Sequence, residues 1–174
     1  MRIPFDESYT GLLGKAVYAF TYYEWTIIYI IEYLQSGFVQ DYSRKTIMTS
    51  GKVSSYFSNL YVAGHEMETD IIKCQKDFAY LFERRNALIH AHPITAEDGA
   101  QILNYQTKPK SIYHDVQWTA DAIKDFISEV DSAEWRAASL LDRLRPKNGN
   151  KTEVADETPI QTSKISSGCG KSGR

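Results

Sequence analysis

A long run of helical periodicity lies near the start of the chain, from about Ser8 to Gln35. Apolar residues recur there every three or four positions and define one broad face: Ala16, Ala19, Phe20, Tyr23, Ile27, Ile30, Ile31 and Leu34. Glu24, Glu32 and several tyrosines interrupt the apolar run, which disfavours a span across a bilayer. We therefore expect a helix buried in a protein core and no membrane association.

Three further segments have the same kind of periodicity, over about 44–62, 66–90 and 119–143. Their predicted inward side chains include Met48, Val53, Phe57 and Leu60, then Met67, Ile71, Cys74, Phe78, Leu81 and Leu88, then Ile123, Phe126, Val130, Trp135 and Leu141. Pro93 disfavours a helical conformation at His92, so the middle segment should end near His90 or Ala91, and Thr119 is placed to cap the last segment. Residues 94–118 are typical of a short β-hairpin or a loop. The sequence thus predicts an all-α fold, an up-and-down four-helix bundle with a small hairpin or loop insertion before the last helix.

Composition divides the chain into a helical domain, 1–145, and a polar C-terminal tail, 146–174. The tail has few large apolar residues, so it buries too little surface to offset the entropy of ordering and is predicted to be disordered. The formal net charge of −2 gives no global positive field of the kind that coats nucleic acid, but it allows a local basic pocket. Cys74 and Cys169 do not have the spacing of a zinc site or a disulfide framework, and we expect a reducing, cytoplasmic setting.

Polar side chains gather at the end of the third periodic segment, in residues 84–90. Arg85 falls on the seam that continues from Phe78 and Leu81, where an apolar side chain is expected. Such an arginine needs an anionic partner or a wet cleft, because an unpaired buried charge is costly. Asn86 and His90 are four residues apart and share a helix face. The three polar groups can therefore converge beside the helix end.

These residue types suit the cleavage of an RNA phosphodiester. Attack by a 2′-hydroxyl on the adjacent phosphorus needs a proton acceptor, a proton donor for the leaving 5′-oxygen, and positive charge for the developing oxyanion. Arg85 would hold the phosphate with its planar fork, His90 would transfer a proton near neutral pH, and Asn86 would orient one of them. One helix supplies a single such proton-transfer group, so we expect a two-fold dimer with a composite site.

Arg85, Asn86 and His90 together resemble the Arg-polar-x-x-x-His motif of HEPN domains, and the resemblance covers roughly Tyr9 to Arg145. It implies a helical bundle, an active site made of these three residues, and a homodimeric endoribonuclease that cuts RNA without a metal or other cofactor. It also implies a role as a toxin or an antiviral defence effector, with a regulatory protein partner as a further candidate. HEPN toxins controlled by nucleotidyltransferase antitoxins carry a tyrosine two residues after the histidine; His92 stands there, so this chain does not support that control.

Other interpretations of the same residues remain open. The chain could be a non-catalytic HEPN-like module that binds RNA, a nucleotide or a protein partner. His90 and His92 could ligate a metal, but no third ligand has a recognisable spacing, so we predict no metal site. Arg84 and His92 are weaker candidates for RNA contact, and Glu24 is a candidate ion-pair partner of Arg85. An ordinary helix C-terminus, where cations favour the helix dipole, would explain Arg85 and His90 without any function.

Overall fold

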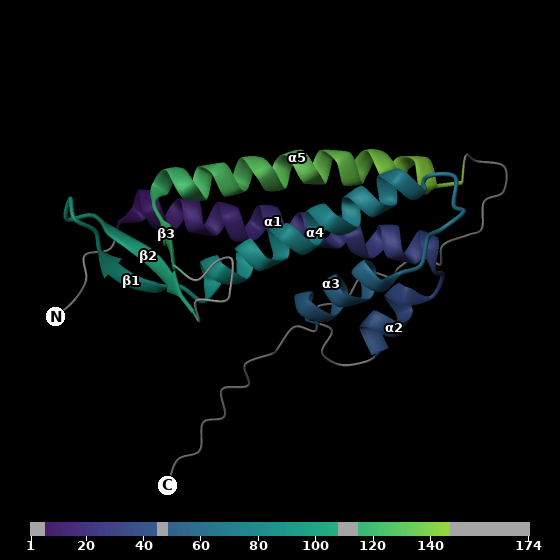
Figure 1. The fold of residues 1–174 in the computed structure, drawn as a ribbon, viewed down its shortest axis with the longest axis horizontal. Helices are drawn as coiled ribbons and strands as arrows, with labels where there is room; N and C mark the ends of the chain where they lie inside the picture. Colours follow the sequence, from purple (N-terminus) through teal and green to yellow (C-terminus); the bar gives the residue numbers. More distant parts are fainter. Residues whose placement is uncertain (1–5, 45–48, 108–114, 147–174) are drawn as a thin grey trace, which may run out of the picture.

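The computed structural model describes residues 6–44, 49–107 and 115–146, which form five helices and a three-stranded sheet (Figure 1). The elements in chain order are α1 (Glu7–Leu34), α2 (Phe38–Arg44), α3 (Ser50–Asn59), α4 (Glu68–Ile89), β1 (His92–Thr95), β2 (Gln101–Gln106), β3 (Asp115–Trp118) and α5 (Ala120–Leu144). The long helices α1, α4 and α5 lie side by side, with α2 and α3 below them and the sheet at the end where α4 stops.

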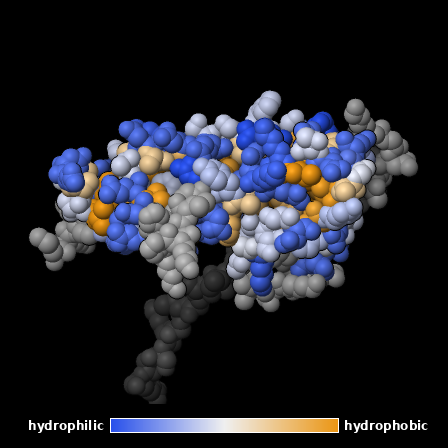
Figure 2. Space-filling model, viewed as in Figure 1, coloured by the Kyte–Doolittle hydropathy of each residue, from blue (hydrophilic) through white to orange (hydrophobic). Residues whose placement is uncertain are grey.

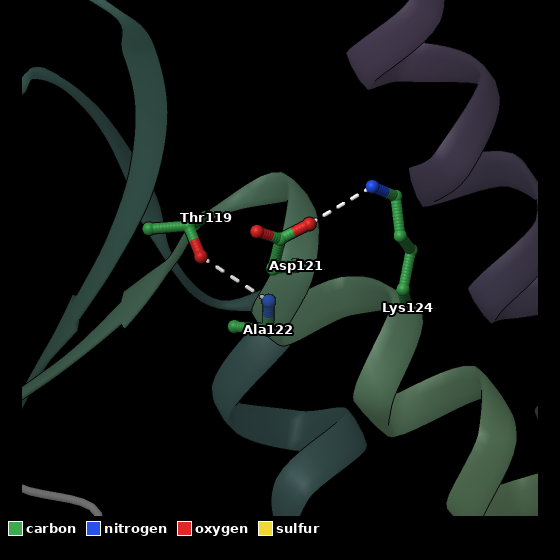
Figure 3. Close-up of polar contacts among 4 residues, drawn as sticks. All are labelled: Thr119, Asp121, Ala122 and Lys124. Carbon is green, nitrogen blue, oxygen red and sulfur yellow. Dashed lines mark hydrogen bonds and ion pairs between the residues drawn. The ribbon is translucent and has the colours of Figure 1, made fainter.

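Side-chain caps fix where α5 and α1 begin. The Thr119 hydroxyl oxygen accepts a hydrogen bond from the backbone N–H of Ala122 at 3.1 Å, and Asp121 forms an ion pair with Lys124 in the same turn (Figure 3). Asp6 caps α1 in the same way. The predicted N-cap at Thr119 is therefore confirmed.

Three ion pairs link α4 to α5 along one edge of their contact. The members on each helix are seven residues apart, and the pairs are Asp70 with Arg143 (2.6 Å), Asp77 with Arg136 (2.8 Å), and Arg84 with Glu129. Residue numbers rise on one helix as they fall on the other, so α4 and α5 are antiparallel. Because each pair joins opposite charges at a fixed height, the ladder disfavours sliding of one helix past the other.

A cluster of aromatic rings centres on Phe78 of α4, which is fully buried. Its ring stacks on Phe20 of α1 at 5.8 Å between centroids and meets the edges of Tyr23 and Phe57 at 5.5 and 6.5 Å. Removing a buried phenylalanine ring generally costs about 3–5 kcal/mol, so this cluster is a main source of the fold's stability. It also holds α1, α3 and α4 together at the middle of α4.

The sheet is antiparallel, in the order β1-β2-β3, and it is anchored to the start of α1. The Tyr9 hydroxyl donates to the Trp118 carbonyl at 2.6 Å and accepts from the Leu103 N–H at 2.9 Å, so it bridges β2 and β3. Trp118 is buried and packs edge-on against Phe126 of α5, with 5.8 Å between ring centroids. The sheet is thereby fixed relative to the helices, and it fixes the segment that follows α4.

The expected mostly helical chain is confirmed, and the periodic segments at 8–35, 66–90 and 119–143 match α1, α4 and α5 closely. An up-and-down four-helix bundle is not confirmed, because the described residues form three long helices, two short ones and a sheet. In the segment predicted as one helix over 44–62, the described residues after Arg44 form one helix, α3, and α2 was not predicted. The inward position expected for Trp135 is wrong, since this side chain is 73% exposed. Met48 and the predicted tail beyond Pro146 lie outside the described residues.

Of the hairpin and the loop that were both predicted for residues 94–118, the structure has strands there, with β2 and β3 pairing as antiparallel neighbours. β1 was not predicted because Pro93 interrupts its short polar sequence; it lies at the edge of the sheet, where a proline is tolerated. The chain therefore turns directly from the end of α4 into an edge strand.

Candidate functional site

The candidate site lies at the end of α4, where the helix gives way to the sheet. His90 is the C-cap residue of α4, and its backbone N–H donates to the Asn86 carbonyl at 3.0 Å. The His90 side chain is exposed, and so is that of His92, the first residue of β1. The chain turns at His90 before it enters β1, and the exposed imidazole is open to a ligand.

The two neighbouring arginines of this helix have very different surroundings. The Arg84 side chain is only 15% exposed and forms an ion pair with Glu129 of α5. Its guanidinium also lies 5.5 Å from the ring centroids of both Trp118 and Phe126. Arg84 was expected on the surface as a weak candidate for RNA contact; instead its charge is compensated inside the fold.

Arg85 has no such partner among the described ion pairs. Its Nη1 donates to Asn86 Oδ1 at 3.1 Å, and its guanidinium lies 5.4 Å from the centroid of the Phe20 ring. The side chain is half-buried, as its position on the apolar seam predicts. A guanidinium offers five N–H donors, so most of its donors remain available for an anion.

Glu24 lies on α1, one helical turn after Phe20, whose ring is in contact with the Arg85 guanidinium. Its Oε2 accepts from the Ser50 hydroxyl at 3.0 Å, while Oε1 is buried and has no hydrogen-bond partner in the described structure. Burial raises the pKa of this carboxyl, and the Ser50 hydrogen bond and the positive charge of Arg85 act in the opposite direction. Glu24 is thus close enough to sense Arg85, although its direct contact is to Ser50.

The structure therefore places Arg85, Asn86 and His90 on the last turns of α4, with a side-chain hydrogen bond between Arg85 and Asn86 and with His90 one turn later at the C-cap. Arg84 instead forms its ion pair with Glu129 of α5. Ser50 was not considered from the sequence, because nothing in its local pattern indicates that the start of α3 meets Glu24. Glu129 was missed for the same reason. Cys74 is no candidate nucleophile, since burial raises the pKa of its thiol to about 11 and keeps it protonated near neutral pH.

A separate cavity lies between the starts of α1 and α5 and the β1–β2 turn. It measures about 810 Å³, and its charged lining residues are four carboxylates and two lysines: Asp6, Glu7, Asp98, Asp121, Lys15 and Lys124. The ion pair in Figure 3 belongs to this lining. An excess of carboxylates disfavours a polyanion, so we do not place an RNA site there.

Two further findings concern the described residues as a whole. They contain no group of three or more histidine, cysteine, aspartate or glutamate side chains that could hold a metal ion. None of their helices combines the length and the apolar character needed to cross a lipid bilayer. The face of the molecule in Figure 2 is largely hydrophilic, with separate hydrophobic patches toward its two ends.

No protein-family model matches the chain, and no curated protein and no solved structure is significantly similar to it.

Proposed function

We propose that this protein is a metal-independent endoribonuclease whose active site is formed by Arg85, Asn86 and His90. The observation that carries the proposal is the contrast between the two arginines. Arg84 forms an ion pair with Glu129, whereas Arg85 forms no ion pair among the described residues and lies beside Asn86, one turn from an exposed histidine. Glu24 acts on Arg85 without a direct contact. The guanidinium donors that do not contact Asn86 are therefore available to a phosphate group.

The chemistry follows from what each group can do. Arg85 would bind two phosphate oxygens and stabilise the extra charge that develops when a 2′-hydroxyl attacks phosphorus. Asn86 already contacts Arg85 and would hold its fork in place. His90 would donate a proton to the leaving 5′-oxygen. The products would be a 2′,3′-cyclic phosphate and a 5′-hydroxyl.

Incubation of the full chain with end-labelled RNA in excess EDTA tests this function. We expect cleavage with cyclic-phosphate ends and no cleavage of an oligonucleotide whose scissile residue lacks the 2′-hydroxyl, because that group is the attacking nucleophile. Cleavage that disappears with EDTA and returns with a divalent metal would contradict the proposal and favour a metal-dependent hydrolase. Binding of RNA without cleavage would favour the non-catalytic module.

We also propose that the protein is a homodimer formed through the outward face of α1. This aromatic face consists of Tyr18, Tyr22, Trp25, Tyr29 and Tyr33, which are 42–74% exposed and spaced three or four residues apart. Large exposed apolar surfaces on a folded protein commonly mark an interaction site, and aromatic residues are enriched in such interfaces. The face is turned away from α4, since α4 contacts Phe20 on the opposite side of α1.

Light scattering over a concentration series tests the dimer. We expect twice the chain mass for the wild type and the monomer mass for Tyr18→Glu/Tyr22→Glu, because two buried carboxylates would oppose the association. As a control, Tyr61→Glu changes another exposed tyrosine outside this face and should leave the mass unchanged. A wild type that is monomeric throughout would contradict the assembly and leave the cleavage proposal standing.

A further inference from the structure

A dimer through the aromatic face would not supply the second proton-transfer group that RNA cleavage needs. The aromatic face and the Arg85 side of α1 are about half a helical turn apart, so each copy of the motif would lie on the far side of its own α1. Each site must then draw both groups from one subunit. Among the described residues, the charge of Arg85 acts on one carboxyl of the neighbouring helix α1, that of Glu24.

The environment of Glu24 is that of an acceptor held in place with one oxygen unused. Ser50 donates to Oε2 at 3.0 Å and so fixes the orientation of the carboxyl. Oε1 is buried without a hydrogen-bond partner in the described structure, which is costly in a folded protein and leaves an acceptor that a ligand could use. Arg85, whose donors are largely unused, is the described charged group that acts on this carboxyl, and α3 contributes only the uncharged Ser50.

Glu24 and His90 also flank Arg85 from opposite directions. Phe20 of α1 contacts both Phe78 and Arg85, and Tyr23 contacts Phe78, so α1 and α4 run antiparallel here. Moving from Phe20 to Glu24 therefore leads toward the start of α4, whereas His90 lies past Arg85 at its end. In-line displacement at phosphorus needs the proton acceptor and the proton donor on opposite sides of the phosphate, which is the order that these three residues have.

We infer that Glu24 is the general base of the proposed ribonuclease and the residue that distinguishes RNA from DNA, by accepting the hydrogen bond and then the proton of the 2′-hydroxyl. The inference rests on the proposed function. A phosphate on Arg85 with its neighbouring 2′-hydroxyl presents an anion and a hydrogen-bond donor side by side, and these match the unused donors of Arg85 and the unused acceptor of Glu24. DNA offers the first and lacks the second. Because Glu24 is only partly buried as a residue, a bound ribose can approach its carboxyl with local side-chain movement.

Both proton transfers of the reaction use side chains of one subunit. The 2′-oxygen forms a bond to phosphorus as its proton passes to Glu24, and the bond from phosphorus to the 5′-oxygen breaks as that oxygen takes a proton from the His90 imidazolium. The products are a 2′,3′-cyclic phosphate and a 5′-hydroxyl, and the two side chains then exchange protons with water. Burial raises the pKa of Glu24 from its ordinary value of 4.5, which brings a carboxylate closer to the range that suits a base near neutral pH.

The pH dependence of cleavage by Glu24→Gln tests the inference. Glutamine has the same shape but cannot take a proton, so we expect the rate to fall roughly 10²- to 10⁴-fold and the residual rate to lose its acidic limb. Glu7→Gln is the matched control, since it removes the same charge from α1 about 25 Å away along the helix and should keep both the rate and the profile. Thermal unfolding of all three proteins checks that they are equally folded.

Binding supplies a second readout that does not depend on turnover. In a His90→Ala background, which blocks cleavage, an oligoribonucleotide should bind roughly 10- to 100-fold more tightly than its 2′-deoxy counterpart, and adding Glu24→Gln should abolish this preference. A wild type that cleaves RNA in EDTA while Glu24→Gln keeps its acidic limb, or keeps the preference for RNA, would overturn the inference and leave the proposed function intact. A wild type without any cleavage would overturn both.

Discussion

Replacing His90 by alanine is expected to lower the rate of RNA cleavage about 10²- to 10⁴-fold, the usual contribution of one positioned acid–base group. The reason is local: the imidazole is exposed at the C-cap of α4, one turn from Asn86, where it can reach a bound phosphodiester. Because the side chain is exposed, its loss should change the free energy of unfolding by less than about 0.5 kcal/mol. Single-turnover cleavage of end-labelled RNA in EDTA and urea denaturation measure the two effects.

Arg85 should show the same separation between activity and stability. Arg85→Ala removes the group that would stabilise the oxyanion, and we expect a loss of roughly 10²- to 10³-fold in rate. Arg85→Lys keeps the charge without the planar fork and should recover only part of it. Lys76→Ala, which removes an exposed cation two turns earlier on α4, is the matched control. Equal rates for wild type, His90→Ala and Arg85→Ala would contradict the site.

The long helices could be predicted from the sequence because their signals are local. The apolar periodicity of α1, α4 and α5 runs over several turns, and the caps at Asp6 and Thr119 lie next to the residues whose backbone they bind. The position of Arg85 on the apolar seam is also a local property. It predicts a guanidinium that is partly buried at the end of α4, and the structure has one there.

What the sequence could not predict depends on contacts between distant segments. Trp135 fits the apolar period of α5 but lies outside the core, because Ala133 and Ala137 occupy the buried face and bring α5 close to its neighbours. Arg84 is indistinguishable from a surface residue until Glu129, 45 positions away, is placed opposite to it. The same holds for Glu24, whose orientation depends on Ser50 at the start of α3.

Arg84 should behave in the opposite way to Arg85, and the comparison of the two is the sharpest check on the site. Truncation of Arg84 to alanine leaves Glu129 without its partner and a void against the rings of Trp118 and Phe126. A fully buried pair would cost about 3–5 kcal/mol when broken. Since the Glu129 side chain is 42% exposed and stays partly hydrated, we expect a loss of roughly 2–3 kcal/mol in the free energy of unfolding.

Arg84→Met separates the two parts of this cost. Methionine fills much of the space between the rings, so it should recover the packing and lose only the ion pair, about 1 kcal/mol at a partly exposed site. Urea denaturation measures both variants, and cleavage rates are corrected for the folded fraction. We then expect Arg84→Met to cut RNA like the wild type. Arg85→Ala, whose free energy of unfolding should stay close to that of the wild type, should not. If Arg84→Met lost activity without losing stability, Arg84 would belong to the phosphate site, and the assignment of the two arginines would have to be reversed.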